Sequence, residues 1–251
     1  LGLCREDQSM PVEAMALFAE AVKVQSSFGA AHHALARAHL AGGALLDSLS
    51  HLKEAAEAEP SSGFIHNDLA IVLDRLERPE DALLHFRRAA LLAPSVDFIR
   101  YNLAYAYHRQ NRYAEAEPEY KAAWDLGLDD SIALLNRGIC LHHLGRLEEA
   151  IGVFSRVIQR KKGYVHNAHY SRGVSFDHLD SHSAALMDWE AAVRLEPRWI
   201  KALSAYADGL EDYANRPDEA RHWYREVLKR DPTHAYAYNG IARTYLHDGI
   251  A

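Results

Sequence analysis

Residues 136–150 read NRGICLHHLGRLEEA, and two interpretations compete for this stretch. Cys140 stands two residues before His142 and His143, and these residue types bind metals or act in catalysis. The same stretch contains Gly138, a small residue whose counterparts recur along the whole chain. The recurrence favours the second interpretation, in which Gly138 allows a close helix contact and Cys140 is buried in helix packing, where free cysteine is common.

Small and bulky residues form columns with a period of 34 or 35 residues. The small column comprises Gly2, Ala36, Ala70, Ala104, Gly138, Gly173, Ala207 and Ala242. The bulky column comprises Phe18, Leu52, Phe86, Tyr120, Phe154, Trp189 and Tyr224. Two further columns, which begin at Ala14 and Ala21, keep the same period. Such self-similarity predicts an array of repeated supersecondary units that stack to bury a continuous core.

Each complete unit has the pattern of two helices. Apolar residues recur three and four apart, as in Leu69, Val72 and Leu73, which predicts one buried face of an α-helix. Glu148 and Glu149 fall at the expected start of a second helix, where the helix dipole favours negative charge. Helix polarity thus explains these glutamates without any catalytic role.

The pattern resembles the tetratricopeptide repeat, a helix-turn-helix unit of about 34 residues. The turn sequences HLGRLEEA (143–150) and RQNRYAEA (109–116) carry the resemblance, and NRPDEA (215–220) has one extra residue. A proline after the second helix recurs as Pro60, Pro94, Pro197 and Pro232. The resemblance covers essentially the whole chain. It implies an all-α fold, a right-handed superhelical solenoid of antiparallel helix pairs.

The register predicts eight units, of which the first is partial and the last is a lone first helix. Their boundaries are 1–28, 29–62, 63–96, 97–130, 131–165, 166–199, 200–234 and 235–251. Leu1 and Leu3 at one end, and the helix from Tyr236 to Leu246 at the other, would each expose an apolar face. We therefore expect a longer parent chain, or another subunit, to cover both ends.

Composition limits the function classes. The chain has 251 residues and a formal net charge of −7, without the clustered cations of a nucleic-acid platform. It contains no apolar run long enough to span a bilayer. The two cysteines, Cys4 and Cys140, fit a reducing compartment. We expect an intracellular and cytoplasmic protein, with an organelle or cilium as alternatives, and neither a nucleic-acid partner nor membrane insertion.

The resemblance implies that a protein partner, an extended peptide or a helix, lies on a concave wall lined by the first helices. The expected groove residues are Phe64, Asn67, Asp68, Phe98, Tyr101, Asn102, Tyr105, Arg109, Leu135, Asn136, Ile139, His143, Asn167, Tyr170, Ser171 and Val174. Among them, Asn136, Ile139 and His143 share one helix stripe within the opening stretch. Adjoining subunits of a complex are the alternative occupants.

Asn102 and Asn136 occupy one column of this wall, with Asp68 before them and Ser171 after. The column partly matches the asparagine ladder of O-linked N-acetylglucosamine transferase, which grips a peptide backbone. An asparagine amide both donates to and accepts from a peptide unit. In the alternative, these asparagines are solvated or bond to a neighbouring helix. The lysines that the family uses to bind a chaperone's C-terminal carboxylate are missing from the matching positions.

The end of the wall is acidic, and Trp199 precedes a first helix there. The acidic residues are Asp177, Asp208, Glu211 and Asp212, which would attract a basic segment, although Lys201 weakens the patch. Trp199 is a further candidate for partner contact.

Enzyme and metal chemistry find little support in the sequence. The sixteen histidines are dispersed over the units. His166 and His169 have a spacing compatible with a metal ligand pair, but no CxxC or HExxH pattern accompanies them. We therefore expect no catalytic residue, cofactor or metal. The favoured function is a non-catalytic scaffold or adaptor. The alternative is a substrate-recruiting or regulatory array of a larger enzyme similar to the glycosyltransferase.

Overall fold

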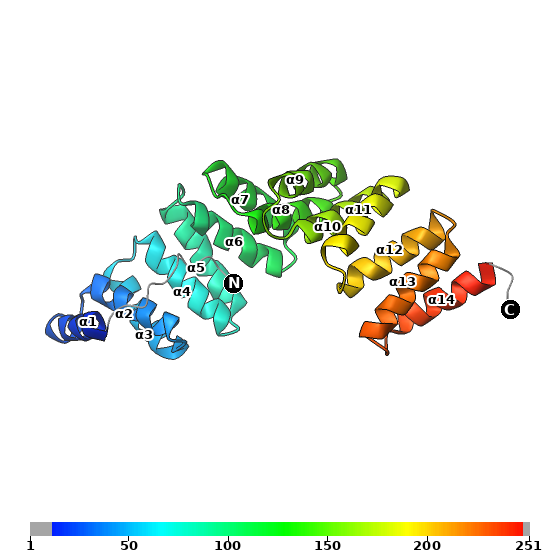
Figure 1. Ribbon diagram of the computed structural model, residues 1–251. Helices are drawn as coiled ribbons and strands as arrows, with labels where there is room; N and C mark the ends of the chain where they lie inside the picture. The colour runs from blue at the N-terminus through cyan, green and yellow to red at the C-terminus, as the bar shows by residue number, and fades with distance from the viewer. Residues whose placement is uncertain (1–11, 248–251) are drawn as a thin grey trace. The chain divides into compact units, whose positions relative to one another are not determined.

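The computed structural model describes residues 12–247, which form an all-α array of helix pairs (Figure 1). No strand occurs within this range. The helices are α1 (Val12–Val24), α2 (Gly29–Ala41), α3 (Leu45–Ala58), α4 (Gly63–Arg75), α5 (Pro79–Leu92), α6 (Asp97–Arg109), α7 (Tyr113–Asp125), α8 (Ser131–His143), α9 (Leu147–Arg160), α10 (Val165–Asp177), α11 (His182–Leu195), α12 (Ile200–Asp212), α13 (Pro217–Arg230) and α14 (Ala235–His247). The predicted all-α repeat fold is confirmed.

The chain divides into two compact units, unit 1 (Leu1–Asp129) and unit 2 (Asp130–Ala251). In unit 1 the helices pair as α2 with α3, α4 with α5 and α6 with α7, and in unit 2 as α8 with α9, α10 with α11 and α12 with α13. Within each unit, a second helix also packs on the first helix of the next pair. Gly2, Cys4, Leu1 and Leu3 lie outside the described residues.

A left-handed residue ends the turn in every pair. The position is held by Gly43, Glu77, Asn111, Gly145, Asp180 and Asn215, whose φ angles lie between 50° and 77°. Glycine adopts this conformation without strain, and asparagine and aspartate tolerate it better than other residues do. Glu77 is therefore the least suitable residue in the column.

Close packing explains the small and bulky columns. A Cβ added to Gly138 would lie 2.4 Å from Cε1 of Phe154, and one added to Gly173 would lie 2.6 Å from Nε1 of Trp189. Phe154 and Cys140 are both fully buried. The cysteine of the opening stretch therefore belongs to the helix packing.

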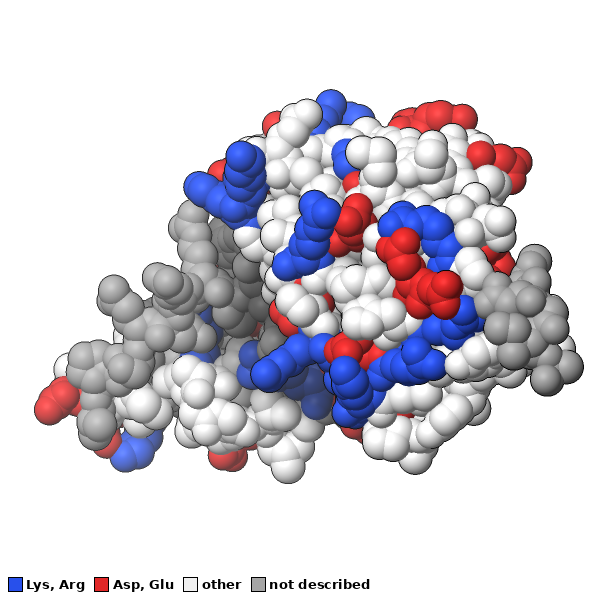
Figure 2. Space-filling view, turned by 45° about the vertical axis from the view of Figure 1, so that its right-hand side comes forward, with Lys and Arg blue, Asp and Glu red and all other residues white. Residues whose placement is uncertain are grey.

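Charged side chains pair along the surface. Arg146 precedes α9 and donates to Glu149 at 2.6 Å, and Arg112 donates to Glu115 at 2.6 Å one pair earlier. Glu149 lies in the first turn of α9, as predicted, and Glu115 has the same place in α7. Figure 2 shows acidic and basic side chains side by side over the face in view.

Candidate functional site

Three first helices of unit 2 surround a hollow of about 480 Å³. It is lined by Ile139, His142 and His143 of α8, Phe154 of α9, Tyr170, Ser171 and Val174 of α10, and Lys201 of α12. The lining therefore combines aliphatic, aromatic and polar side chains from four helices. A pocket of this mixed kind suits a side chain of a bound segment.

His142 lines this hollow as a neutral imidazole. Its Nδ1 lies 3.0 Å from Oγ of Ser175, which itself donates to the Ser171 carbonyl at 3.0 Å. The imidazole is therefore the donor to Ser175, which assigns the proton to Nδ1 and leaves Nε2 as an acceptor. Burial, and then the neighbouring His178 and His143, lower the pKa of His142.

Tyr170 supplies an aromatic wall. Its ring lies 4.8 Å from that of Trp199, which makes an edge contact with His166 at 5.4 Å. Burial, and then the charge of Asp208, raise the pKa of the Tyr170 phenol, so the group stays neutral. Trp199 is half-buried through these contacts.

Lys201 is the cation of the hollow. Its side chain is exposed and forms no ion pair with any residue that the structure describes. It stands 34 residues after Asn167, in the column that begins with Phe64 and Phe98. The sequence pattern already places Lys201 on the wall, as a cation that weakens the acidic patch. His142 lies beside the predicted stripe and had no such signal, whereas Phe154 belongs to the bulky column and was expected in the helix packing.

Five of the predicted groove residues come together in this hollow: Ile139, His143, Tyr170, Ser171 and Val174. Asn136 and Asn167 are half-buried on the same helices. Leu135, by contrast, is buried among the helices, and its side chain is not open to a partner. Whether a partner binds there stays a prediction.

The predicted groove residues of unit 1 include three buried side chains, Asn67, Tyr101 and Asn102. Asn102 Nδ2 donates to Asn67 Oδ1 at 2.8 Å, so these amides hold α4 against α6. Asn67 in turn donates to Asp68, whose carboxylate lies 2.8 Å from Nε2 of His33 on α2. For Asn102, the structure therefore shows the bond to a neighbouring helix that the sequence left as an alternative.

The remaining residues of this face are more open. Phe64 is 49% exposed, and its ring lies 6.1 Å from that of the half-buried Phe98. Arg109 pairs with Asp74 at 2.5 Å beside Tyr105. The hollow between α4 and α6 is small, about 190 Å³.

The acidic end of the wall is partly neutralised inside the protein. Glu211 lies 3.0 Å from Nη2 of Arg243, and Asp208 accepts hydrogen bonds from the hydroxyls of Tyr224 and Tyr236. Burial raises the pKa of both Asp208 and Glu211. Because these carboxylates link α12, α13 and α14, they are less able to attract a basic segment than the sequence suggested.

Asp177, also in that cluster, is engaged too. It accepts a hydrogen bond from Tyr213, which raises the pKa of that phenol to about 12, and it lies 3.3 Å from Nδ1 of His182. Asp212 is exposed. Over residues 12–247, no group of three or more His, Cys, Asp or Glu side chains could hold a metal ion. In the same range, every helix is too short or too polar to cross a membrane.

Comparisons with known proteins agree with this architecture. The family model of the tetratricopeptide repeat matches residues 67–127, 101–165 and 210–251, which together cover more than half of the chain. A tetratricopeptide protein fragment from Cytophaga hutchinsonii is 12% identical, with a TM-score of 0.72, over 91% of this chain and 93% of that one.

Two further solved structures are similar in fold. YrrB, described as having an unusual peptide-binding site, is 18% identical with a TM-score of 0.63, over 75% of this chain and 96% of its own. The Cut9–Hcn1 hetero-tetramer of the APC/C is 14% identical with a TM-score of 0.62, over 93% of this chain and 46% of that chain. At these identities the likeness describes the fold alone.

Proposed function

This chain belongs to the tetratricopeptide repeat family, and from that premise we propose that it is a non-catalytic scaffold that binds a segment of a partner protein. The hollow between α8, α10 and α12 is the observation that carries the proposal. It offers aliphatic contact from Ile139 and Val174, an aromatic wall from Tyr170, and the unpaired cation of Lys201. Such a surface favours a segment with one bulky apolar side chain and a nearby acidic group.

The polar groups of this site suit capture rather than catalysis. His142 is neutral and committed through Nδ1 to Ser175, and the Ser175 hydroxyl is committed to a backbone carbonyl. No nucleophile is therefore activated by this histidine. The free Nε2 acceptor and the Lys201 ammonium are both suited to orienting a bound chain.

Site-specific photo-crosslinking tests the proposal. A photoreactive phenylalanine analogue is placed at Val174 in the hollow and, as the control, at Met187, which is 72% exposed on α11. In extracts of the source cells, the probe at Val174 should crosslink a defined protein that the probe at Met187 does not. Tyr170→Ala combined with Lys201→Glu should abolish that product while the far-UV circular dichroism stays unchanged. Equal products from both positions would refute the proposal.

A further inference from the structure

The exposed face of α5 differs from those of its neighbours. Leu84 and Leu91 stand seven residues apart and are 65% and 75% exposed. Residues seven apart share one face of a helix, and those three or four apart lie between them on that face. Arg87 and Arg88 occupy the intermediate positions, are exposed, and have no ion-pair partner among residues 12–247. We call Leu84, Arg87, Arg88 and Leu91 the α5 stripe.

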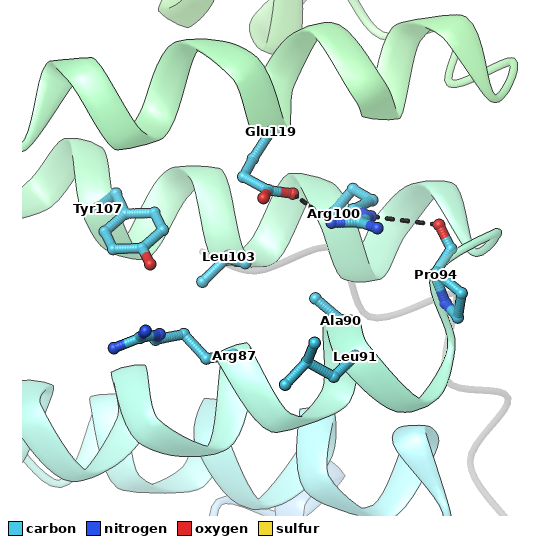
Figure 3. A pocket seen from close by; sticks show the side chains of 8 residues that line it. All are labelled: Arg87, Ala90, Leu91, Pro94, Arg100, Leu103, Tyr107 and Glu119. Atoms are coloured by element: carbon cyan, nitrogen blue, oxygen red, sulfur yellow. Dashed lines mark hydrogen bonds and ion pairs between the residues drawn. The ribbon is translucent and has the colours of Figure 1, made fainter.

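A hollow of about 330 Å³ lies beside this stripe, between α5 and α6. Figure 3 shows Leu91 and Ala90 of α5 and Leu103 of α6 pointing into it, with Arg87 and Tyr107 at one end. At the other end, Arg100 is held by Glu119 at 2.8 Å and by the Pro94 carbonyl at 3.2 Å. The arginine at this end is therefore occupied, whereas Arg87 at the opposite end is free to meet a ligand.

The preceding repeat provides an internal comparison. A similar hollow of about 290 Å³ lies between α3 and α4. The positions that correspond to the α5 stripe, 34 residues earlier, are Ser50, Lys53, Glu54 and Glu57. The groove is thus a general product of helix stacking. The four corresponding α3 positions hold no leucine and no arginine, although Leu46, one turn before Ser50, is exposed, and their charges include both signs.

The following second helix lacks the stripe as well. Its corresponding residues on α7 are Pro118, Lys121, Ala122 and Asp125, and Lys121 pairs with Asp125 at 2.5 Å. Exposed leucines and unpaired arginines therefore coincide only on α5 among the second helices α3, α5 and α7. Apolar surface rimmed by charge is typical of an interaction site.

We propose that the α5 stripe and its hollow form a second docking surface, which binds an acidic amphipathic helix of a partner protein. Large aliphatic side chains of that helix cover Leu84 and Leu91. One of these partner side chains enters the hollow and contacts Leu103 and Tyr107. Its Asp or Glu residues pair with Arg87 and Arg88. Charge complementarity selects the acidic partner, because these two arginines are a local positive site on a chain whose net charge is −7.

A pair of model peptides tests this surface by fluorescence anisotropy with the whole chain. The acidic probe is a helical peptide with leucines three and four residues apart, flanked by glutamates. Its twin has lysine at every glutamate. The acidic probe should bind the wild type, more weakly as salt is added, and the lysine twin should bind at least about tenfold more weakly.

Two variants locate the binding. Arg87→Glu with Arg88→Glu should weaken the acidic probe by about tenfold or more and reverse the preference towards the lysine twin. Leu84→Ser with Leu91→Glu, which installs the α3 residues, should also abolish binding. Lys53→Glu on α3 is the control that should leave binding unchanged, because it lies outside both proposed sites.

Three results would overturn the proposal. The first is failure of the acidic probe to bind the wild type, and the second is binding that survives the Arg87→Glu, Arg88→Glu change. The third concerns a lipid surface, tested by flotation with phosphatidylserine vesicles. If the wild type floats with the vesicles, the α5 variants do not, and the acidic probe fails to bind, the stripe is a membrane-contact surface instead.

Discussion

Gly138→Ala should destabilise the α8–α9 pair, although alanine is the better helix former. In an open helix position, replacing glycine by alanine stabilises by about 1 kcal/mol. At position 138 the new Cβ would lie 2.4, 2.8 and 2.9 Å from three ring carbons of Phe154. Ordinary carbon contacts begin near 3.4 Å, so the ring or the helix has to move by about 1 Å.

Phe154 is fully buried, and the free space beside it is the hollow that it lines between α8, α10 and α12, so relaxation of the ring has to be directed there. Overpacking of a packed core costs about 1 to 3 kcal/mol, and three close contacts place this case in the upper half of that range. After the helix-propensity gain is subtracted, we expect a net destabilisation of roughly 1 to 2 kcal/mol.

Gly152→Ala is the matched control. Gly152 lies inside α9, is exposed, and has no atom within 4 Å of a Cβ added there. The same substitution should therefore stabilise the protein by about 0.5 to 1 kcal/mol. Two changes of identical chemistry in one helix pair are thus expected to have opposite signs.

Urea denaturation followed by far-UV circular dichroism measures both variants, with amide hydrogen exchange in α8 as a local readout, since repeat arrays do not always unfold in one step. Adding Phe154→Leu to Gly138→Ala should recover part of the loss, because Ala36 and Leu52 already form this pair in α2 and α3. If Gly138→Ala is as stable as the wild type, the close-approach explanation of the small column is wrong.

Three further predictions concern the left-handed turn residue Glu77, the hydrogen bond between Asn102 and Asn67, and two histidines. Glu77→Gly should stabilise unit 1 by about 1 kcal/mol, measured as a raised urea midpoint, because φ at this residue is 58°; an unchanged midpoint would contradict the strain argument. Asn102→Ala should cost about 1 to 3 kcal/mol, because it leaves the buried Asn67 without its 2.8 Å donor; unaltered thermal melting would mean that the amide pair contributes nothing. Burial, and then a neighbouring histidine, lower the pKa of His51 and His85 below the ordinary 6.5, so the folded state binds fewer protons than the unfolded chain. Stability should therefore fall as pH drops below about 6.5, and His51→Gln with His85→Gln should flatten the profile; a slope that the double variant leaves intact would exclude these histidines as its source.

The opening stretch shows how far local pattern reaches. The 34-residue period placed Gly138 in a close helix contact and Cys140 in the packing, and the structure has both there. Helices and turns depend on residues a few positions apart, and comparison of several repeats is what separates the packing columns from the rest. The boundaries of the eight repeats remain a prediction, since helix pairing alone does not determine where one repeat ends and the next begins.

Tertiary structure decided which residues of the predicted wall are accessible. Asn102 and Ile139 are both first-helix residues of the predicted stripe and each borders a hollow, yet Asn102 is 1% exposed and bonded to Asn67, whereas Ile139 is half-buried beside Lys201. The difference arises from distances between side chains about 35 or 60 residues apart, which depend on how closely successive helices approach. The sequence by itself determined the repeat and its register. Only the packing of the helices determined which polar groups form hydrogen bonds inside the protein and which stay accessible to a partner.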